Sequence, residues 1–542
     1  VTGEIYMKSK NAPYNLIKDY TDLKDMIYKN SVEFAETNIV SFERDGSKVS
    51  ITFKRMREDI DALGTYFYNS GLKGGKCIAL VGENCYEWII TYFAAVMGGN
   101  IIVPLDKELT DEELKVLIKS GNCEMLVHSK KKETLLDFAN ENGIKTLCFS
   151  DADDALKKGK EAIAAGDSEF IEKPINIDEC CSIIFTSGTT GTPKGVMLSQ
   201  RNLICDAKHS LETLKFPKGT VNILPLNHTF GFMANILTQF WVGYPVYINR
   251  GLRYIMHDIQ EAKPGHLAIV PLFLEKFYKT IWKTAEKQGK AKTLKKAIAA
   301  SNAMRKVGID MRKTLFKSVL NAFGGNLEML ISGGAPLDEK LVKGFDDLGI
   351  TVINGYGITE CSPIVAITRE CWIKHGSVGL PIPTVHVKVD NPDENGEGEI
   401  CIKGDIVMMG YYNEPEKTAE VMENGWFNTG DIGSVDSDGF LYITGRKKNL
   451  ILLDNGKNVY PEELETSIGR IENVDEVIVY EEGGLITAEI YAENSDAKEQ
   501  IKKDIQEFNK SIAAYKQIRK IKFRTVEFEK TTTRKIKRFL VR

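Results

Sequence analysis

A turn rich in glycine and threonine follows a short apolar strand, and this combination constrains the fold more than any other stretch of the chain. Residues 180–185 (CCSIIF) are apolar and β-forming, and they lead directly into residues 186–195 (TSGTTGTPKG). Glycine has no Cβ, so successive backbone N–H groups can turn toward one point. The hydroxyl groups and the charge of Lys194 add further donors. The stretch predicts a loop that holds phosphate oxygens at the end of a buried strand.

The loop does not follow the nucleotide-binding pattern G-x-x-x-x-G-K-[ST]. Counted from Gly188, the sixth position is Pro193, and the residue after Lys194 is Gly195. Taken alone, the stretch could also be a flexible surface loop, because Gly/Ser/Thr tracts are common. A basic residue that closes such a tract right after a buried strand favours phosphate binding.

Strands and helices alternate through the first 150 residues. Apolar strands are predicted at residues 77–81, 101–104, 125–128 and 146–149, with helices at 86–97, 112–120 and 134–142. This alternation is typical of a parallel sheet covered by helices. We expect the charged residues 157–179 to form a surface excursion and residues 269–273 to form a further strand. The predicted fold class is α/β.

Composition narrows the class of protein. A chain of 542 residues is too long for one core, so two or more domains are expected. The 71 basic and 75 acidic residues are nearly balanced, which argues against nucleic acid as a partner. Ten cysteines without a CxxC pair indicate reduced, buried thiols. No apolar leader opens the chain, and glycines interrupt the apolar run 88–105, so we expect a cytoplasmic protein.

Two more strands end in glycine-rich turns. Residues 329–332 lead into Gly333-Gly-Ala-Pro336, and residues 351–353 lead into Asn354-Gly-Tyr-Gly-Ile-Thr-Glu360. Ligands of open α/β sheets bind at such strand ends. Tyr356 offers a flat face to a purine, Thr359 a hydroxyl to phosphate, and Glu360 a hard oxygen to Mg²⁺. Each could be a plain turn, but together with residues 186–195 they predict a nucleotide site.

The pattern changes after residue 396 to short strands and turns, which predicts a small β-subdomain. Asp431 lies in a turn flanked by glycine, where its carboxylate can accept both hydroxyls of a ribose, and Arg446 can donate to the sugar or to phosphate. The lysine pair after Arg446 predicts a linker. We therefore expect a large domain at 1–446 and a small α+β domain at 447–542.

Residues 276–317 carry thirteen Lys or Arg and only two acidic residues. The block is either a solvated helical face or a contact with anionic phospholipid headgroups or a polyanionic cofactor, and composition alone leaves both open. His228 stands alone among apolar and aromatic residues, which by itself indicates a core or loop histidine.

Taken together, these motifs resemble those of the adenylate-forming superfamily, which includes acyl-CoA synthetases, peptide-synthetase adenylation domains and firefly luciferase. The resemblance covers nearly the whole chain, in order. Residues 270–277, the basic block before residues 331–337, and the ending Lys535-Ile-Lys-Arg538 make it most similar to the long-chain fatty acyl-CoA synthetases. Many relatives have glycine before the catalytic lysine, whereas this chain has Arg534.

The resemblance implies a role for each residue. Lys535 would be the catalytic lysine, Thr359 would touch the α-phosphate and Glu360 would bind Mg²⁺. Asp431 and Arg446 would hold the ribose, and Lys448 would be the hinge of a mobile C-terminal domain. The acyl and CoA channel would be bordered by His228, Phe232 and Gly456. The remaining ATP contacts would be Thr186, Ser187, Gly188, Thr189, Thr190, Gly191, Lys194, Gly334, Ala335, Tyr356 and Gly357.

The implied activity is ATP-dependent activation of a fatty acid through acyl-AMP, followed by transfer to coenzyme A. ATP, Mg²⁺ and coenzyme A are the implied cofactors. An acyl-AMP or acyl-carrier-protein ligase, and a non-catalytic nucleotide- or lipid-binding relative, are the alternatives. The protein is expected to be a monomer or homodimer, cytoplasmic, with residues 276–317 in peripheral contact with the inner face of the membrane.

Overall fold

The computed structural model describes residues 15–186, 193–453, 458–530 and 536–541. Contacts within the chain divide it into two units. The first comprises residues 1–375, 379–385 and 404–420, and the second comprises residues 376–378, 386–403 and 421–542. The predicted linker at residues 447–448 lies inside the second unit, and the predicted division into 1–446 and 447–542 stays a prediction.

A seven-stranded sheet in the first unit carries the glycine- and threonine-rich stretch. Its order is β18-β8-β7-β4-β3-β5-β6. The pairings among β3 to β7 are parallel, as predicted, whereas β8 and β18 add to the edge in antiparallel fashion. The strands are β3 (Cys77–Val81), β4 (Ile101–Leu105), β5 (Cys123–His128), β6 (Lys145–Cys148), β7 (Cys180–Thr186), β8 (Lys194–Ser199) and β18 (Gly410–Tyr411).

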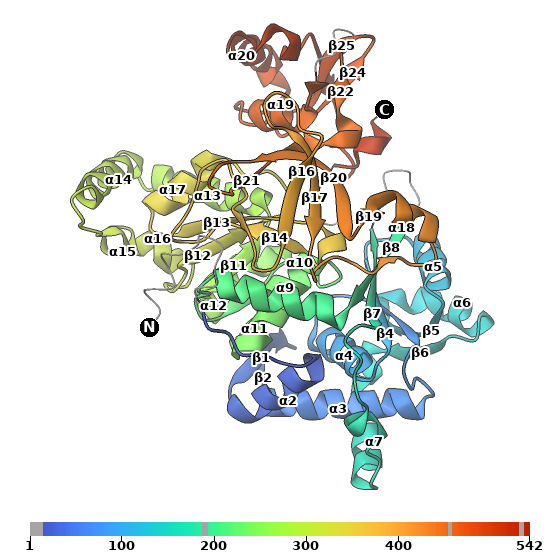
Figure 1. Ribbon diagram of the computed structural model, residues 1–542. Helices are drawn as coiled ribbons and strands as arrows, with labels where there is room; N and C mark the ends of the chain where they lie inside the picture. The colour runs from blue at the N-terminus through green and yellow to red at the C-terminus, as the bar shows by residue number, and fades with distance from the viewer. Residues whose placement is uncertain (1–14, 187–192, 454–457, 531–535, 542) are drawn as a thin grey trace. The chain divides into compact units, whose positions relative to one another are not determined.

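Helices cover this sheet because its central strands are apolar on both faces, as in β3, where every residue is buried. Helix α4 (Tyr86–Met97) is itself buried along its whole length. Helix α5 (Asp111–Ser120) begins at a capping box formed by Thr110 and Glu113. Its apolar side and that of α6 (Leu136–Glu141) pack on the sheet, at the right of Figure 1.

A second sheet of the first unit has nine strands, in the order β15-β14-β13-β12-β11-β9-β10-β1-β2. The six neighbouring strands from β13 to β1 are parallel, and antiparallel pairs close both ends. The strands are β1 (Asn38–Arg44), β2 (Ser47–Thr52), β9 (Thr220–Asn222), β10 (Val246–Ile248), β11 (His266–Ile269), β12 (Met329–Ser332), β13 (Thr351–Gly357), β14 (Ile364–Ile367) and β15 (Leu380–Pro381).

The strand predicted at residues 269–273 is wrong. Strand β11 ends at Ile269, and α13 (Pro271–Lys287) begins two residues later with proline at its first turn. Proline favours that position because its fixed φ suits a helix and its missing N–H would have no partner there. Helices α12 (Ile255–Ala262), α13, α16 (Lys317–Ala322) and α17 (Glu339–Asp347) share one core with this sheet.

Residues 157–179, expected as a surface excursion, are partly helical. Helix α7 (Ala152–Ala164) packs against α3 (Phe53–Asn69), and Gly159 permits the close approach, since a Cβ there would lie 1.9 Å from the Ala62 carbonyl oxygen. The other helices of the first unit are α2 (Leu23–Glu33), α8 (Glu169–Glu172), α9 (Gln200–Thr213), α10 (Thr229–Phe232), α11 (Thr238–Val242), α14 (Ala291–Arg305), α15 (Arg312–Leu315) and α18 (Pro415–Val421).

The second unit combines the predicted β-subdomain with the predicted α+β pattern. Its five-stranded sheet contains β16 (His386–Asp390), β17 (Gly398–Lys403), β19 (Met422–Glu423), β20 (Trp426–Val435) and β21 (Leu441–Arg446). A two-stranded sheet pairs β22 (Ile451–Leu452) with β23 (Asn458–Val459). A three-stranded sheet of β24 (Glu476–Glu482), β25 (Leu485–Tyr491) and β26 (Lys520–Arg524) shares a core with α19 (Pro461–Ile468) and α20 (Lys498–Lys510).

All ten cysteines lie in the described residues, and none of them forms a disulfide there. The predicted burial holds for six of them, whereas Cys85, Cys180 and Cys205 are partly exposed and Cys371 is exposed. Within the same residues, no helix has the length and apolar character needed to cross a bilayer.

A buried histidine makes the stability of the first unit depend on pH. His266, at the start of β11, is fully buried, and its Nδ1 lies 2.7 Å from the Pro217 carbonyl oxygen. Burial lowers the pKa of His266 to about 4. A histidine of the unfolded chain titrates near pH 6.5. Between pH 6.5 and 4, the unfolded chain therefore binds a proton that the folded chain does not bind. The free energy of unfolding is highest above pH 6.5 and falls as pH decreases toward 4.

We expect the loss between pH 7 and pH 5 to be about 2 kcal/mol from this group. Urea unfolding at the two pH values, compared between the wild type and His266→Asn, measures it, because asparagine can still donate to Pro217. The exposed His375→Asn controls for the loss of an imidazole. Equal pH slopes for the wild type and His266→Asn would contradict the prediction.

Candidate nucleotide and acyl site

The glycine- and threonine-rich stretch connects two antiparallel strands. Thr186, the last residue of β7, pairs with Lys194, the first residue of β8, and its Oγ1 donates to the Lys194 carbonyl oxygen at 3.4 Å. Ser187, Gly188, Thr189, Thr190 and Gly191 lie outside the described residues. The ends of the predicted phosphate loop are therefore set by the register of a hairpin at the end of a parallel sheet.

Tyr411 contacts two of the predicted site residues. Lys194 Nζ lies 4.6 Å from the centroid of the Tyr411 ring, and the Tyr411 hydroxyl donates to Glu360 Oε1 at 3.1 Å. The backbone N–H of Met408 donates to the Glu360 carbonyl oxygen at 2.8 Å. The lysine of the predicted phosphate loop and the carboxylate predicted to hold Mg²⁺ thus contact the same buried side chain.

Helix α9 anchors the two segments that carry these groups. The Asn202 amide donates to the carbonyl oxygens of Asp405 and Val407, at 2.7 and 3.0 Å. One turn later, Asp206 accepts the N–H of Ile364 at 3.1 Å. Asp206 is fully buried, and burial raises the pKa of its carboxyl well above the usual range. Hydrogen bonds from one helix therefore fix the segment before Tyr411 and the segment after Glu360.

The two other glycine-rich turns leave adjacent strands of the nine-stranded sheet. Strands β12 and β13 are parallel neighbours, with Ser332 opposite Asn354, so their ends lie side by side. Gly334, with φ of +84°, and Ala335 follow β12 and are exposed. Half-buried Tyr356 lies at the end of β13. This geometry can hold a flat base between the two turns.

Gly357 is required by the tight hairpin that follows. A Cβ at this position would lie 2.2 Å from the Pro363 carbonyl oxygen, a distance that no side chain tolerates. The chain then turns through a short 3-10 helix, Thr359–Cys361, which carries Thr359 and Glu360. The glycine thus allows this turn to fold back against β14.

An apolar cavity borders the same elements. Its wall includes Ile184, two residues before Thr186, and Ser362, two residues after Glu360. Phe232 also lines it, and its ring centroid lies 4.1 Å from that of Tyr92. The cavity measures about 10 Å³, close to one water molecule, so these rings must separate to admit an acyl chain. The other lining residues are Pro104, Ser182, Leu198, Leu203, Leu226, Asn227, Thr229 and Met233.

The segment that contains His228 runs beside this cavity and beside the glycine-rich turn that follows β12. His228 immediately precedes α10, and it is partly exposed. A Cβ on Gly333 would lie 3.4 Å from the ring of Phe230 and 3.6 Å from the Gly355 carbonyl oxygen. Residues 228–232 are thereby placed between the predicted adenine-binding turns and the apolar cavity.

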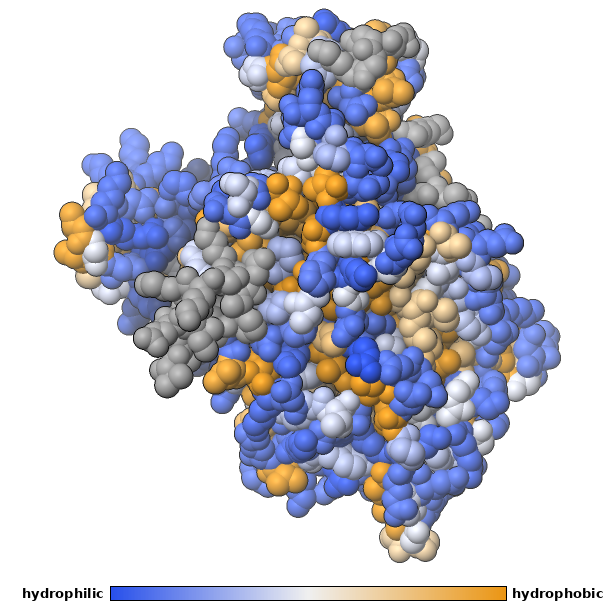
Figure 2. Space-filling view, viewed as in Figure 1, coloured by the Kyte–Doolittle hydropathy of each residue, from blue (hydrophilic) through white to orange (hydrophobic). Residues whose placement is uncertain are grey.

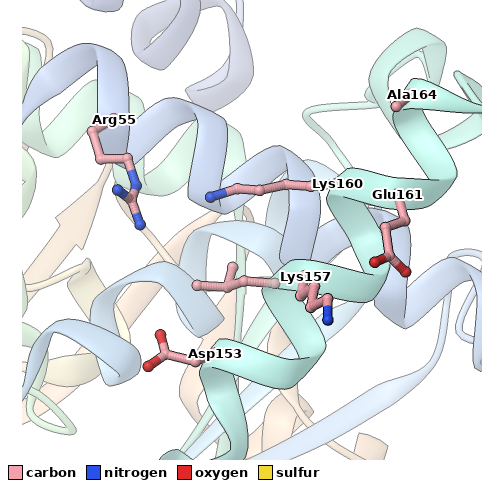
Figure 3. A pocket seen from close by; sticks show the side chains of 7 residues that line it. Arg55, Asp153, Lys157, Lys160, Glu161 and Ala164 are labelled. Carbon is pink, nitrogen blue, oxygen red and sulfur yellow. The ribbon is translucent and has the colours of Figure 1, made fainter.

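A separate hollow of about 370 Å³ opens between α3 and α7, away from all predicted site residues (Figure 3). Two of its cations are already paired, since Arg55 Nε and Lys160 Nζ lie 2.8 and 2.7 Å from the carboxylate of buried Asp59. The hollow therefore resembles an open seam between two helices. It is a weaker ligand site than the residues around Glu360, despite its larger volume.

In the second unit, Asp431 and Arg446 are brought together. The turn predicted for Asp431 is wrong, because the chain there is the middle of β20, which pairs with β17 and β21. Asp431 stands opposite Arg446 of β21, and Arg446 Nε lies 2.5 Å from Asp431 Oδ1. Asp431 is buried, and Thr429 Oγ1 accepts its backbone N–H at 3.0 Å. Lys448 follows in the 3-10 turn Lys447–Asn449. Gly456 lies outside the described residues.

Lys535 also lies outside the described residues, but the chain just beyond it is anchored. Arg538 NH2 lies 2.5 Å from both carboxylate oxygens of Glu465, and Arg538 NH1 donates to the Val479 carbonyl oxygen at 2.8 Å. Contacts from both terminal nitrogens of the guanidinium group fix its direction as well as its position. The C-terminal end of the predicted lysine segment is therefore attached to α19 and β24.

The donors around Glu360 fit magnesium. Mg²⁺ prefers hard oxygen ligands and is commonly held by one or two carboxylates together with substrate phosphates. Glu360 supplies a carboxylate and neighbouring Thr359 a hydroxyl. Among the described residues, no group of three His, Cys, Asp or Glu is placed to bind a metal ion. One carboxylate beside one hydroxyl suits an ion that phosphate oxygens also hold.

Sequence analysis missed Tyr411, Asn202 and Asp206. Their partners are far away in the chain, as in the Tyr411–Glu360 contact across 51 residues. The pair Gly410-Tyr411 after the glycine-rich run at 396–404 was the only local signal for Tyr411, and a two-residue strand is too short to show a period.

Comparison with known proteins agrees with this geometry. Residues 29–412 match the family described as AMP-binding enzyme. Long-chain-fatty-acid–CoA ligase 5 of Rattus norvegicus is 30% identical over 471 residues, which cover 80% of this chain and 69% of that protein. Long-chain-fatty-acid–CoA ligase FadD15 of Mycobacterium bovis is 26% identical over 98% of this chain and 96% of that protein.

Solved structures share the fold over nearly the whole chain. ATP-bound MatB from Rhodopseudomonas palustris has a TM-score of 0.78 at 23% identity and covers 96% of this chain and 98% of its own. The anthranilate CoA ligase AuaEII, in complex with anthranoyl-AMP, has a TM-score of 0.78 at 21% identity, with 97% of both chains covered. The fold is that of adenylate-forming enzymes. The chain belongs to the AMP-binding enzyme family.

Proposed function

We propose that this protein is an AMP-forming fatty acid–CoA ligase that acts on long-chain acids. The observation that carries the proposal is the apolar cavity whose walls begin at Ile184 and Ser362, each two residues from a predicted phosphate or metal contact. A carboxylate at the mouth of such a cavity would meet the α-phosphate while its chain lies among aliphatic and aromatic groups. The curated relatives named above support the same substrate class.

The first half-reaction joins two anions, and the site residues reduce their repulsion. A carboxylate oxygen attacks the α-phosphorus of ATP, the bond from that phosphorus to the oxygen bridging to the β-phosphorus breaks, and pyrophosphate leaves with the electron pair. Lys194 and the hairpin 186–195 hold the leaving group, and Lys535 stabilises the charge that builds on the α-phosphate. Mg²⁺, when bound at Glu360, neutralises phosphate charge.

In the second half-reaction, the thiolate of coenzyme A attacks the acyl carbonyl carbon and AMP leaves. The thiolate needs the space that Lys535 occupies in the first step. A rotation of residues 447–542 at Lys448 would withdraw the lysine and admit coenzyme A along the channel bordered by Gly456 and His228. Asp431 and Arg446 hold the ribose through both steps.

A panel of carboxylic acids from acetate to oleate, read by pyrophosphate release, tests the proposal. We expect release to depend on the acid and to be fastest with long chains. Coenzyme A and acyl carrier protein are then supplied separately, and thioester is measured. Thioester with carrier protein alone would favour the acyl-carrier-protein ligase, and no acid-dependent release would favour a non-catalytic relative.

We also propose that the basic block at 276–317 makes peripheral contact with anionic lipid. The loop between α14 and α15 exposes Val307 at 74% and Ile309 at 51% of their surfaces. Many of the neighbouring lysines are exposed, and the lobe that contains α14, at the left of Figure 2, is mostly hydrophilic with an apolar outer edge. Apolar side chains beside lysines are the combination that binds acidic membrane surfaces.

Co-sedimentation with vesicles should therefore require phosphatidylglycerol and fall as salt is added. Val307→Asp with Ile309→Asp should weaken binding about tenfold or more, because each change removes apolar contact and adds repulsion. Val32→Asp, at a valine exposed to 80% on α2, is the matched control. Binding that is absent, or insensitive to salt, would leave the block as a solvated helical face.

A further inference from the structure

Tyr411 is held from several directions at the edge of the seven-stranded sheet. Its backbone N–H donates to Thr418 Oγ1 at 2.9 Å, and the residue pairs with Val196 of β8. The next N–H, that of Tyr412, donates to the Gly195 carbonyl oxygen at 2.7 Å. Only 5% of Tyr411 is exposed. The side chain therefore has a fixed position relative to β8, on which Lys194 lies.

The ring of Tyr411 restricts Lys194. A lysine side chain is long and rotates freely, and it loses this freedom when it binds phosphate. With Nζ 4.6 Å from the ring centroid, the charge lies within the range of a cation–π contact. The contact keeps the ammonium group near the hairpin before nucleotide arrives.

The hydroxyl of Tyr411 restricts Glu360. It donates to Oε1, so one carboxylate oxygen is oriented by the protein and the other can face an ion. Carboxylates that bind metals are usually hydrogen-bonded in this way, and loss of such a partner commonly weakens metal binding or activity 10- to 100-fold. One side chain thus orients a cation for phosphate and an anion for magnesium.

We propose that Tyr411 is a positioning residue that couples the binding of ATP to that of Mg²⁺, by fixing Lys194 and Glu360 relative to each other. The inference rests on the proposed function, since it assigns both groups to the ATP site. A buried tyrosine with a purely structural role would also need a hydrogen-bond partner. Removing the hydroxyl of such a tyrosine would not change the factor by which Mg²⁺ strengthens ATP binding. That difference separates the two roles.

Calorimetric titration of the full chain with ATP, with and without Mg²⁺, gives the factor by which Mg²⁺ strengthens ATP binding. In Tyr411→Phe the ring remains and the hydroxyl is lost. We expect ATP affinity without Mg²⁺ to stay within about twofold of the wild type, because the cation–π contact remains. The strengthening by Mg²⁺ should fall about 10- to 100-fold.

In Tyr411→Leu the ring is lost as well. ATP affinity without Mg²⁺ should then fall about two- to tenfold, in addition to the weaker response to Mg²⁺. Tyr412→Phe is the matched control, because that hydroxyl contacts the Asn122 amide at 3.1 Å, and we expect wild-type values. Thermal unfolding of each variant reports whether it is folded.

An unchanged response to Mg²⁺ in Tyr411→Phe, in a wild type that binds Mg²⁺·ATP more tightly than ATP, overturns this inference alone. Equal titrations of Tyr411→Phe and Tyr411→Leu without Mg²⁺ overturn the role of the ring. If Tyr411→Leu does not fold, Tyr411→Phe still decides the coupling. A wild type that binds no ATP under either condition overturns the proposed function together with the inference.

Discussion

Replacing Lys535 by alanine should separate the two half-reactions. We expect formation of acyl-AMP, followed as fatty-acid-dependent pyrophosphate release, to fall at least about 100- to 1,000-fold, because a preorganised charge next to the α-phosphate is lost. Thioester formation from supplied acyl-AMP and coenzyme A should be nearly unaffected, since the lysine must leave the site before that step. Separate assays of the two steps measure the difference.

Lys537→Ala is the matched control, because Lys537 lies two residues away in the same basic segment. The anchor formed by Arg538 and Glu465 is present in both variants, so the position of the segment should not change. If Lys535→Ala retains both half-reactions, or loses both equally, Lys535 is not the lysine that acts on the α-phosphate.

Replacing Asp431 by asparagine should reduce the contribution of the ribose to ATP binding, because the carboxylate charge is lost. A hydrogen bond to a charged carboxylate contributes about 1.5–3 kcal/mol and one to a neutral group about 0.5–1.5 kcal/mol, so ATP binding should weaken about tenfold or more when two charged bonds become neutral ones. Asparagine keeps the shape of the buried side chain, and titration calorimetry measures the affinity.

A cycle with deoxy-ATP isolates the ribose from the ion pair with Arg446. The wild type should bind ATP much more tightly than 2′- or 3′-deoxy-ATP, and this difference should be clearly smaller in Asp431→Asn. Asp438→Asn, at an exposed carboxylate in the turn after β20, is the control. If Asp431→Asn still distinguishes ATP from deoxy-ATP as the wild type does, another group holds the sugar.

Local patterns predicted those parts of the fold that depend on neighbouring residues. The strands β3 to β6 and β12, and helices α4 and α5, were found because their apolar residues repeat with a clear period or fill a short buried run. The strand predicted at residues 269–273 was wrong because a short apolar run is compatible with both a strand and a helix. Pro271, at the first turn of α13, favours the helix. The antiparallel return of β8 was not predicted, since glycine-rich turns close hairpins and crossovers alike.

The candidate site divides in the same way. Glu360 stands in a glycine-rich turn that is visible in the sequence, whereas Asp431, expected in such a turn, lies within β20. Tyr411 and Asp206 act through pairings set by the packing of distant segments, and no window of sequence contains both partners. Ser187–Gly191, Gly456 and Lys535 lie outside the described residues, and their roles, like those of the other site residues, remain predictions.

The anchoring of the Glu360 and Tyr411 segments by α9 has a consequence for how this protein can diversify. Directional bonds from Asn202 and Asp206 hold the segments of the proposed nucleotide site, whereas most of the cavity wall consists of side chains held only by contact. Exchanges of one aliphatic group for another can therefore accumulate in that wall and alter which acids are accepted. Such exchanges leave the hydrogen-bonded segments of the proposed nucleotide site unchanged. Substrate preference can therefore change during evolution while the activation step is kept.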